Sequence, residues 1–408
     1  MKKMITGKRL AWLFAYVYFA SYVTRINFAA VIQEVVTDTG YEKSALSIIL
    51  VCMSISYGIG QIINGWIGDH IKPQNLIFIG LITATTVNTV FPFFTATIPL
   101  MCVLWTINGF AQAMMWPPIV KIMVSTMDEV TYGEASVIVS LGSSVGTIFV
   151  YLTAPLVITL LSWEFVLFAS AAIGLLSVIL WAFLKDRTYD ENAIVQEAKD
   201  SVKNASDQRF SFPKEAIFPI IFIALAIVCQ GMLRDGVSNW MPSLLSETFD
   251  MGNSASILCT VSLSAFSMVA FILAGAFYKK FFKNEVTCAA VIFLIATVSA
   301  LLLSLLLNTG VIAAVILMTL ITGAVHGVNL MLIGHVPKRF RKYGNISTIS
   351  GAVNSCTYVG SAIATYGIAK LSEAFGWSVT VMIWCVIAAL GTLFCVNAML
   401  KWKKFIEK

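Results

Sequence analysis

Two arginines lie inside long apolar stretches of the chain, 209 residues apart: Arg25 and Arg234. Arg25 follows fourteen uncharged residues (11–24) and precedes eight more (26–33), and Arg234 follows eighteen (216–233). An arginine at the centre of a bilayer costs about 3 kcal/mol or more, so it normally faces a bundle interior or a water-filled cavity. A guanidinium stays charged and offers paired planar donors that match two oxygens of a phosphate. The two residues therefore predict a central anion site.

The composition of the chain indicates a membrane protein. Apolar residues make up 58% of it and charged residues 12%, whereas soluble domains are typically about 25% charged. A helix needs about 20 apolar residues to cross the hydrocarbon. The sequence predicts an all-α membrane protein with twelve transmembrane helices, at residues 11–35, 45–70, 76–96, 98–124, 132–157, 163–184, 216–246, 254–278, 286–307, 310–334, 346–369 and 377–400. The first run lacks a small-residue cleavage site, so we expect it to remain as a helix.

The positive charges predict the orientation of these helices. Lysine and arginine gather on one side, in the N-terminus, the 185–214 segment, the 338–342 loop and the C-terminus, while the other side carries mainly Asp and Glu. The positive-inside rule makes the basic side cytoplasmic. We expect a multi-pass protein of the plasma membrane with both termini in the cytoplasm. Basic loops facing an anionic leaflet account for the net charge of +6, so no nucleic-acid partner is expected.

Residues that would support an enzyme or a metal site are missing from the sequence. All eight cysteines lie inside predicted spans, without a CxxC or Cys/His cluster, and are interpreted as packing residues. No nucleophile motif or Walker loop is present. We expect no enzymatic activity, no metal and no cofactor.

The chain divides into two halves that resemble each other. A polar stretch without apolar periodicity, 186–214, is predicted to link an N-terminal six-helix half (1–185) to a C-terminal one (215–408). Matching residues recur at a nearly constant offset: Arg25 with Arg234 at 209, Ser44-Ala45 with Ser254-Ala255 at 210, and Tyr132-Gly133 with Tyr343-Gly344 at 211. Parallel six-helix repeats with substrate at the midplane are the plan of major facilitator transporters. We expect the major facilitator fold, as a monomer.

Five stretches resemble one family within that superfamily, the organophosphate:phosphate antiporters, which include the glycerol-3-phosphate and hexose-6-phosphate transporters. Tyr22-Val-Thr-Arg25-Ile-Asn27-Phe28 is similar to the family's Tyr-x-x-Arg-Lys-Asn-Phe motif. The other four stretches are Ser56-Tyr57-Gly58 with Gly65-Trp-Ile-Gly-Asp69, the segment from Gly109 to Pro118, Arg234-Asp-Gly-Val-Ser-Asn-Trp240-Met-Pro242, and Phe375-Gly376-Trp377. The resemblance covers nearly the whole chain. It implies that Arg25 and Arg234 form the phosphate-binding site.

Several positions depart from the family pattern. The lysine that follows the first arginine is Ile26 here, and the helix-two lysine of the glycerol-3-phosphate carrier aligns with Gln61. The helix-five histidine of that carrier aligns with Ser143, and helix eleven offers Asn354 where the hexose phosphate carrier has a lysine. We therefore expect a retained phosphate clamp with a different pocket for the organic moiety, in which Gln61, Ser143 and Asn354 contact the substrate.

Four further residues are candidates for the same site. Tyr18 and Tyr22 are four residues apart on one helix face, and Arg25 follows at three, so all three can face one cavity. His326 aligns with a cavity tyrosine of the family, and Gln112 lies at the equivalent place in helix four. For each of the four, a packing role is the alternative interpretation.

Two acidic residues receive different predictions. Asp69, in a degenerate form of the facilitator loop motif between helices two and three, is assigned to gating, through an ion pair and a helix dipole at the cytoplasmic helix ends. Asp235 directly follows Arg234, but consecutive helical residues point about 100° apart, so we do not expect it to neutralise that arginine. A pairing of Asp235 with another helix stays open.

The predicted activity is exchange of a phosphorylated metabolite, of the sugar phosphate or glycerol phosphate class, for inorganic phosphate by alternating access. Arg25 and Arg234 belong to different halves, so a bound dianion would draw the halves together, and two facing cations would oppose closure of an empty carrier. One alternative is a proton-coupled symporter of an organic carboxylate. Such coupling usually needs an intramembrane carboxylate, and Asp235 is almost the only one. A membrane sensor of sugar phosphate is the third reading.

Overall fold

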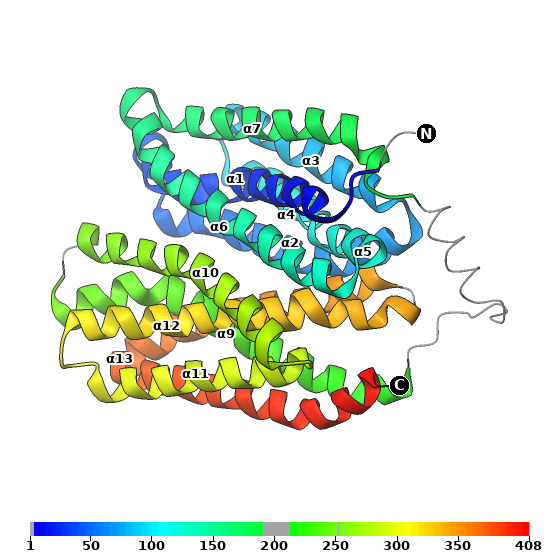
Figure 1. Cartoon of the computed structure of the whole chain (residues 1–408). Helices are drawn as coiled ribbons and strands as arrows, with labels where there is room; N and C mark the ends of the chain where they lie inside the picture. The colour runs from blue at the N-terminus through cyan, green and yellow to red at the C-terminus, as the bar shows by residue number, and fades with distance from the viewer. Residues whose placement is uncertain (1–3, 191–212, 252, 344, 408) are drawn as a thin grey trace. The chain divides into compact units, whose positions relative to one another are not determined.

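The structure, a computed structural model, consists of helices joined by short turns over the residues it describes, which are 4–190, 213–251, 253–343 and 345–407 (Figure 1). Most of the predicted linker, 186–214, lies outside these ranges. The long helices are α1 (Gly7–Thr39), α2 (Lys43–His70), α3 (Pro73–Val90), α4 (Ile98–Gln112), α5 (Trp116–Thr126), α6 (Glu129–Leu160), α7 (Trp163–Leu184), α9 (Lys214–Phe249), α10 (Asn253–Phe281), α11 (Glu285–Leu306), α12 (Val311–Asn329) and α13 (Ile346–Ile406). Short helical turns are η1 (Phe91–Phe94), η2 (Lys185–Arg187), η3 (Leu330–His335) and η4 (Val336–Tyr343).

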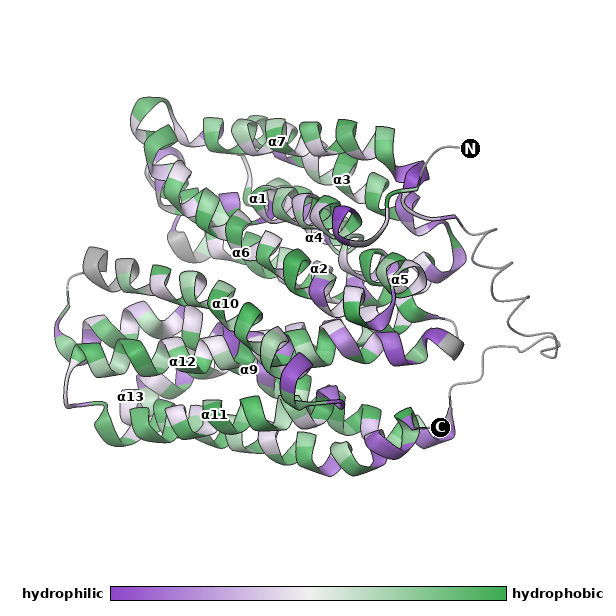
Figure 2. Ribbon diagram, in the orientation of Figure 1, coloured by the Kyte–Doolittle hydropathy of each residue, from purple (hydrophilic) through white to green (hydrophobic). Residues whose placement is uncertain are grey.

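These helices supply the twelve predicted spans. Among the described residues, ten helical stretches are long and apolar enough to cross a membrane, and hydrophobic residues cover most of their length (Figure 2). One of the ten joins α4 to α5. The remaining two spans are α1 and the part of α13 before Gly376, whose φ of 74° divides α13 into two helices. The prediction of an all-α membrane protein with this fold is confirmed.

The interruption between α4 and α5 follows from proline chemistry. Pro117 and Pro118 occupy the first turn of α5, where the missing N–H groups would have had no helical partner. The chain makes a tight turn at Ala113–Met115 before them, with the Met114 amide bonded to Ala111. The helix therefore breaks at the Trp-Pro-Pro segment that the sequence singled out.

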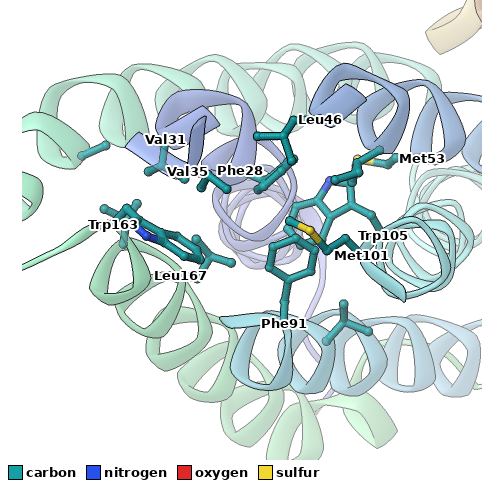
Figure 3. Close-up of a cluster of buried hydrophobic side chains, with 14 residues drawn as sticks. Phe28, Val31, Val35, Leu46, Met53, Phe91, Met101, Trp105, Trp163 and Leu167 are labelled. Carbon is teal, nitrogen blue, oxygen red and sulfur yellow. The ribbon is translucent and has the colours of Figure 1, made fainter. Parts of the chain in front are cut away.

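The described residues group into two compact units. One comprises Met1–Ser211 with Phe340–Ala352, and the other comprises Phe212–Arg339 with Val353–Lys408. The N-terminal unit holds a buried apolar cluster that joins α1, α2, α4 and α7 around Phe28, Phe91 and Trp105 (Figure 3). The segment 340–352 departs from the predicted division of the chain at 185 and 215, because it packs with the N-terminal unit.

Tryptophan side chains tie the helices of each unit in a repeated pattern. Trp163 at the start of α7 donates to Asp38 at the end of α1 (3.1 Å), and Trp377 donates to Glu247 at the end of α9 (2.8 Å). The acceptors are 209 residues apart, the offset of the two arginines.

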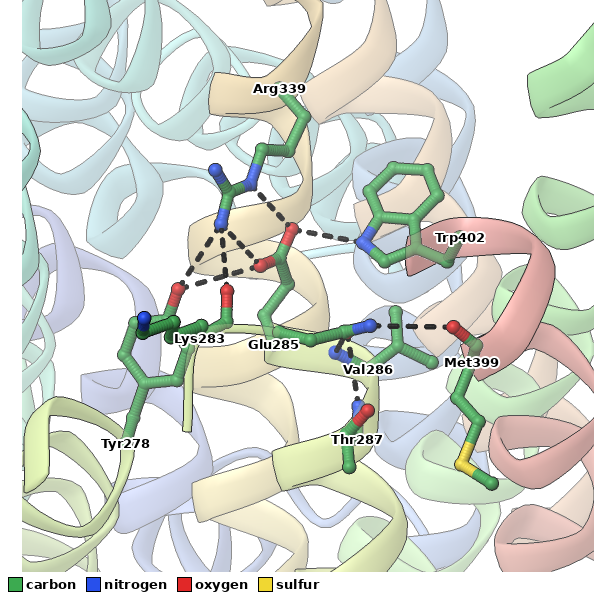
Figure 4. Close-up of polar contacts among 9 residues, drawn as sticks. Tyr278, Lys283, Glu285, Val286, Thr287, Arg339, Met399 and Trp402 are labelled. Atoms are coloured by element: carbon green, nitrogen blue, oxygen red, sulfur yellow. Dashed lines mark hydrogen bonds and ion pairs between the residues drawn. The ribbon is translucent and has the colours of Figure 1, made fainter. Parts of the chain in front are cut away.

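A second tryptophan tie recurs at the opposite helix ends. Trp181 donates to the Gln74 carbonyl at the start of α3 (2.9 Å), and Trp402 donates to Glu285 at the start of α11 (3.0 Å). Glu285 is fully buried and also pairs with Arg339 at 2.9 Å (Figure 4). The internal repeat is therefore visible in contacts as well as in sequence.

Candidate functional site

Arg25 lies against two tyrosine rings in the N-terminal unit. Its guanidinium carbon is 4.1 Å from the ring centre of Tyr57 on α2 and 5.4 Å from that of Tyr22 on α1. A cation over an aromatic face gains about 0.5–2 kcal/mol, depending on desolvation. A cation–π contact engages the charge of the guanidinium without using its N–H groups as hydrogen-bond donors to the ring, so this contact is compatible with anion binding.

Gln61 lies one helical turn after Tyr57 on α2 and is fully buried. Within the described residues, neither its amide nitrogen nor its amide oxygen has a hydrogen-bond partner. An orphaned buried polar group costs about 1–3 kcal/mol, so its presence calls for a water or ligand partner. The side-chain amide of Gln61, a predicted substrate contact, could therefore hydrogen-bond to a hydroxyl or phosphoryl group of a substrate.

Tyr18 and Ser143 lie on either side of the contact between α1 and α6. The Tyr18 ring packs against Tyr22, with centres 5.1 Å apart, as their spacing predicts. Gly146 of α6 allows a close approach, because an added Cβ there would meet Tyr22 and Phe19 at 2.9 Å. The buried Ser143 hydroxyl donates to the Ser140 carbonyl at 2.6 Å.

Gln112 belongs to a buried amide network around Thr24. Its amide nitrogen donates to the Thr24 hydroxyl at 3.0 Å, and its amide oxygen accepts from Ser21. The Thr24 carbonyl accepts from Asn88 (2.8 Å) and Asn108 (3.1 Å), which ties α3 and α4 to α1 one residue before Arg25. Gln112 is thus engaged on both its donor and its acceptor, and we assign it a positioning role for α1.

Arg234 is paired with Asp235, and the expectation that this neighbour would not neutralise it is wrong. Nε of Arg234 is 2.7 Å from one carboxylate oxygen of Asp235, and Nη2 is 3.0 Å from the other. The argument from consecutive residues concerns the direction of Cβ, but the long arginine side chain bends sideways over the surface of α9. Nη2 also donates to Ser361 at 3.2 Å, and the Tyr358 ring centre lies 5.4 Å from the guanidinium carbon.

Asn354 and His326 complete the predicted residues of the C-terminal unit. Asn354 is buried one turn before Tyr358 on α13. His326 is partly buried on α12, with Nδ1 2.8 Å from the Thr322 carbonyl and its ring edge-on to Phe271. The carbonyl contact of His326 is therefore within its own helix.

Asp69 binds the N-terminus of α13. Its carboxylate oxygens accept from the backbone amides of Ser347 (3.1 Å) and Thr348 (2.7 Å), and one lies 3.6 Å from Nζ of Lys121. The Asp69 side chain is only 4% exposed. A carboxylate at a helix N-terminus meets both unpaired N–H groups and the positive end of the dipole. This geometry combines the ion pair and the helix dipole named in the sequence-based prediction.

Sequence reasoning missed three residues that contact the arginines: Tyr57, Tyr358 and Ser361. Tyr57 belongs to the Ser56-Tyr57-Gly58 stretch that resembles the antiporter family, and Tyr358 and Ser361 follow Asn354 at one and two turns of the same helix. That spacing was a usable signal. Among the described residues, no group of three or more His, Cys, Asp or Glu could hold a metal ion.

Comparison with known families and proteins gives consistent results. Residues 14–365 match the Major Facilitator Superfamily. The chain is 26% identical to a glycerol-3-phosphate transporter of Bacillus subtilis, over 88% of this chain and 85% of that protein. It is 24% identical to a probable hexose phosphate transport protein of Chlamydia trachomatis, over 89% and 84%. It is 22% identical to the membrane sensor protein UhpC of Salmonella typhimurium, over 92% and 88%.

Solved structures share the fold at lower identity. The transporter FucP in its outward conformation superposes with a TM-score of 0.73 at 14% identity, covering 95% of this chain and 97% of that one. A proton:xylose symporter, XylE, gives a TM-score of 0.69 at 11% identity, over 94% and 93%. At these identities the likeness establishes the fold alone.

Proposed function

The chain belongs to the Major Facilitator Superfamily, and from this premise we propose that it is an antiporter that exchanges a phosphorylated organic metabolite for inorganic phosphate. The metabolite is of the sugar phosphate or glycerol phosphate class. One observation carries the proposal: each half places one arginine in the middle of its first helix, against an aromatic ring, at an offset of 209 residues. Relatives named for glycerol-3-phosphate and hexose phosphate transport support it.

The mechanism that we propose uses the two arginines as a divided clamp. Each presents planar donors that suit phosphoryl oxygens. A dianion held by both would lower the barrier to reorientation, whereas the empty carrier would keep an excess positive charge in a low-dielectric region, because two guanidinium groups face the single carboxylate of Asp235. Reorientation therefore proceeds with an anion bound, and exchange is obligatory. The carrier works as a monomer in the plasma membrane, with both termini in the cytoplasm.

The surrounding residues are proposed to select the organic moiety. Tyr18 and Tyr22 lie on α1 with Arg25, Ser143 lies on the neighbouring helix α6, and Gln61 offers a buried amide without a described hydrogen bond, one turn from Tyr57. In the C-terminal half, Asn354 and His326 neighbour the helix segment that bears Arg234. These are hydroxyl, amide and imidazole groups, so we propose that they recognise hydroxyl groups of a substrate whose charge resides in its phosphate.

Reconstitution into liposomes tests the proposal. Vesicles loaded with phosphate are expected to take up radiolabelled phosphate and organophosphates, and vesicles without internal phosphate are not. Glycerol-3-phosphate, hexose-6-phosphates, phosphoenolpyruvate and phosphoglycerates form the substrate panel. Strong uptake of a carboxylate into empty vesicles under an imposed pH gradient would replace antiport by the symport alternative. Specific phosphate binding without any exchange would favour a sensor, as in the relative UhpC.

A further inference from the structure

The Arg234–Asp235 ion pair occupies part of the surface that a substrate anion would need. Asp235 engages the edge formed by Nε and Nη2 of the guanidinium, in the bidentate geometry that a phosphate would adopt. The side chains are 19% and 27% exposed, so the pair is accessible rather than sealed in the core.

We propose that Asp235 is a built-in competitor of the substrate anion at Arg234, and that a dianion binds there together with one proton, which Asp235 accepts. The inference rests on the proposed function and adds the charge class of the bound species. A monoanion binds without proton uptake, because it does not require Asp235 to lose its charge.

Charge balance in the spans supports this assignment. Arg25 and Arg234 contribute two positive charges, and Asp235, when ionised, contributes one negative charge. A bound dianion would leave a net charge of −1 in a region where charge is costly. One proton on Asp235 restores neutrality, and a monoanion gives neutrality with Asp235 ionised. A protonated Asp235 also releases the Nε edge of Arg234 to the anion.

The helices packed against α9 bring few other titratable groups to the pair. On α12 the group is His326. On α13 it is Tyr358, over the guanidinium. Residues 261–277 of α10 carry no charged side chain, and His335 of η3 stacks on Tyr278. His326 is thus the competing proton acceptor that an experiment has to separate from Asp235.

Sulfate and methyl sulfate provide the probe, because sulfate is a dianion and methyl sulfate a monoanion throughout the neutral range. Purified full-length protein in detergent is titrated with each anion at about pH 6.5, close to the second pKa of a phosphate ester, in weak buffer with a pH indicator. Wild-type protein is expected to take up about one proton per sulfate bound and none with methyl sulfate. This comparison requires no variant, and bound sulfate without proton uptake would overturn the inference.

Variants identify the proton acceptor. Asp235→Asn is expected to bind sulfate without proton uptake. At higher pH it should bind sulfate more tightly than wild-type protein does, because no carboxylate competes for Arg234. Asp235→Glu and His326→Gln are expected to keep the proton uptake per sulfate bound. Loss of uptake in His326→Gln with retention in Asp235→Asn would assign the proton to the histidine and overturn the inference.

Phosphate exchange separates this inference from the proposed function. In liposomes, the KM for phosphate should vary with pH in wild-type protein and vary less in Asp235→Asn. Sulfate-linked proton uptake without any phosphate exchange would reject antiport and leave the role of Asp235 standing. Phosphate exchange in a protein that does not bind sulfate would reject the role of Asp235. The transported form would then be the protonated phosphate monoanion, which brings its own proton.

Discussion

At the scale of single residues, the two arginines differ in what they already contact. Arg25 rests on the rings of Tyr57 and Tyr22, and Arg234 is held by the carboxylate of Asp235. Each half therefore supplies one guanidinium group, but the groups that surround the two arginines carry different charges. An anion that binds at Arg234 has to compete with a carboxylate, and the described contacts of Arg25 are with aromatic rings.

Replacing either arginine by lysine is expected to remove most of the phosphate exchange. Lysine keeps the charge but loses the planar fork, and a charge-assisted hydrogen bond contributes about 1.5–3 kcal/mol. We expect Arg25→Lys and Arg234→Lys each to lower kcat/KM by about 10- to 100-fold in phosphate-loaded liposomes. Arg9→Lys, at an exposed position before the first span, is the matched control and should match wild type. Wild-type exchange in both span variants would make the arginines structural.

The positions of these residues could be predicted from sequence, and their partners only in part. Arg25 and Arg234 stand out because a charge within an apolar run is costly wherever the chain folds. The Arg234–Asp235 pair was missed because Cβ directions do not limit a side chain with four rotatable bonds. The sequence predicts Gln112 as a substrate contact but does not show that Ser21 and Thr24 hydrogen-bond to its amide.

At the scale of elements, glycines set how closely neighbouring helices approach. Gly231 of α9 lies against the Thr357 carbonyl of α13, and Gly360 of α13 lies against the Val228 carbonyl of α9. This reciprocal contact holds the helix of Arg234 to the helix of Tyr358 and Ser361. Small residues serve this purpose between membrane helices.

Gly231→Ala is expected to destabilise the C-terminal half and to reduce exchange. The added methyl group would overlap the Thr357 carbonyl, and overpacking of this kind costs about 1–3 kcal/mol. Gly367→Ala on α13 is the control, since its added Cβ meets nothing within 4 Å. Thermal unfolding in detergent should show a lower midpoint for the first variant and an unchanged one for the second. Equal midpoints would mean that α9 and α13 can separate at no cost.

The sequence predicted the number of spans because hydrophobic length is a local property. The turn between α4 and α5 was not predicted, because its residues lie inside the single predicted span 98–124, although prolines at 117 and 118 disfavour continuation of a helix from the preceding residues. The tryptophan ties were not predictable, because Asp38 and Trp163 are 125 residues apart and neither residue type indicates a partner. Their repetition at Glu247 and Trp377 becomes visible only in three dimensions.

At the scale of the whole molecule, the chain crosses between the two compact units at defined points. Arg339 closes one stretch of the C-terminal unit, Phe340–Ala352 groups with the N-terminal unit, and Val353 resumes the C-terminal unit. Arg339 is fixed to its own unit by the buried Glu285 (Figure 4). The segment 340–352 is held within the N-terminal unit by Asp69, whose carboxylate accepts from the amides of Ser347 and Thr348.

Asp69→Ala is therefore expected to loosen the start of α13. The carboxylate accepts from the amides of Ser347 and Thr348, and loss of such charge-assisted hydrogen bonds costs about 1.5–3 kcal/mol. Hydrogen–deuterium exchange of a peptide spanning these two amides should quicken by about 10- to 100-fold. Asp128→Ala is the control. Asp128 caps α6 by accepting a hydrogen bond from the Thr131 amide, which lowers the pKa of the Asp128 carboxyl. None of the described hydrogen bonds joins Asp128 to an amide of α13. Its removal should leave the 347–348 amides protected. Unchanged protection in Asp69→Ala would show that the segment is held by helix packing alone, and gating by Asp69 would then lack its physical basis.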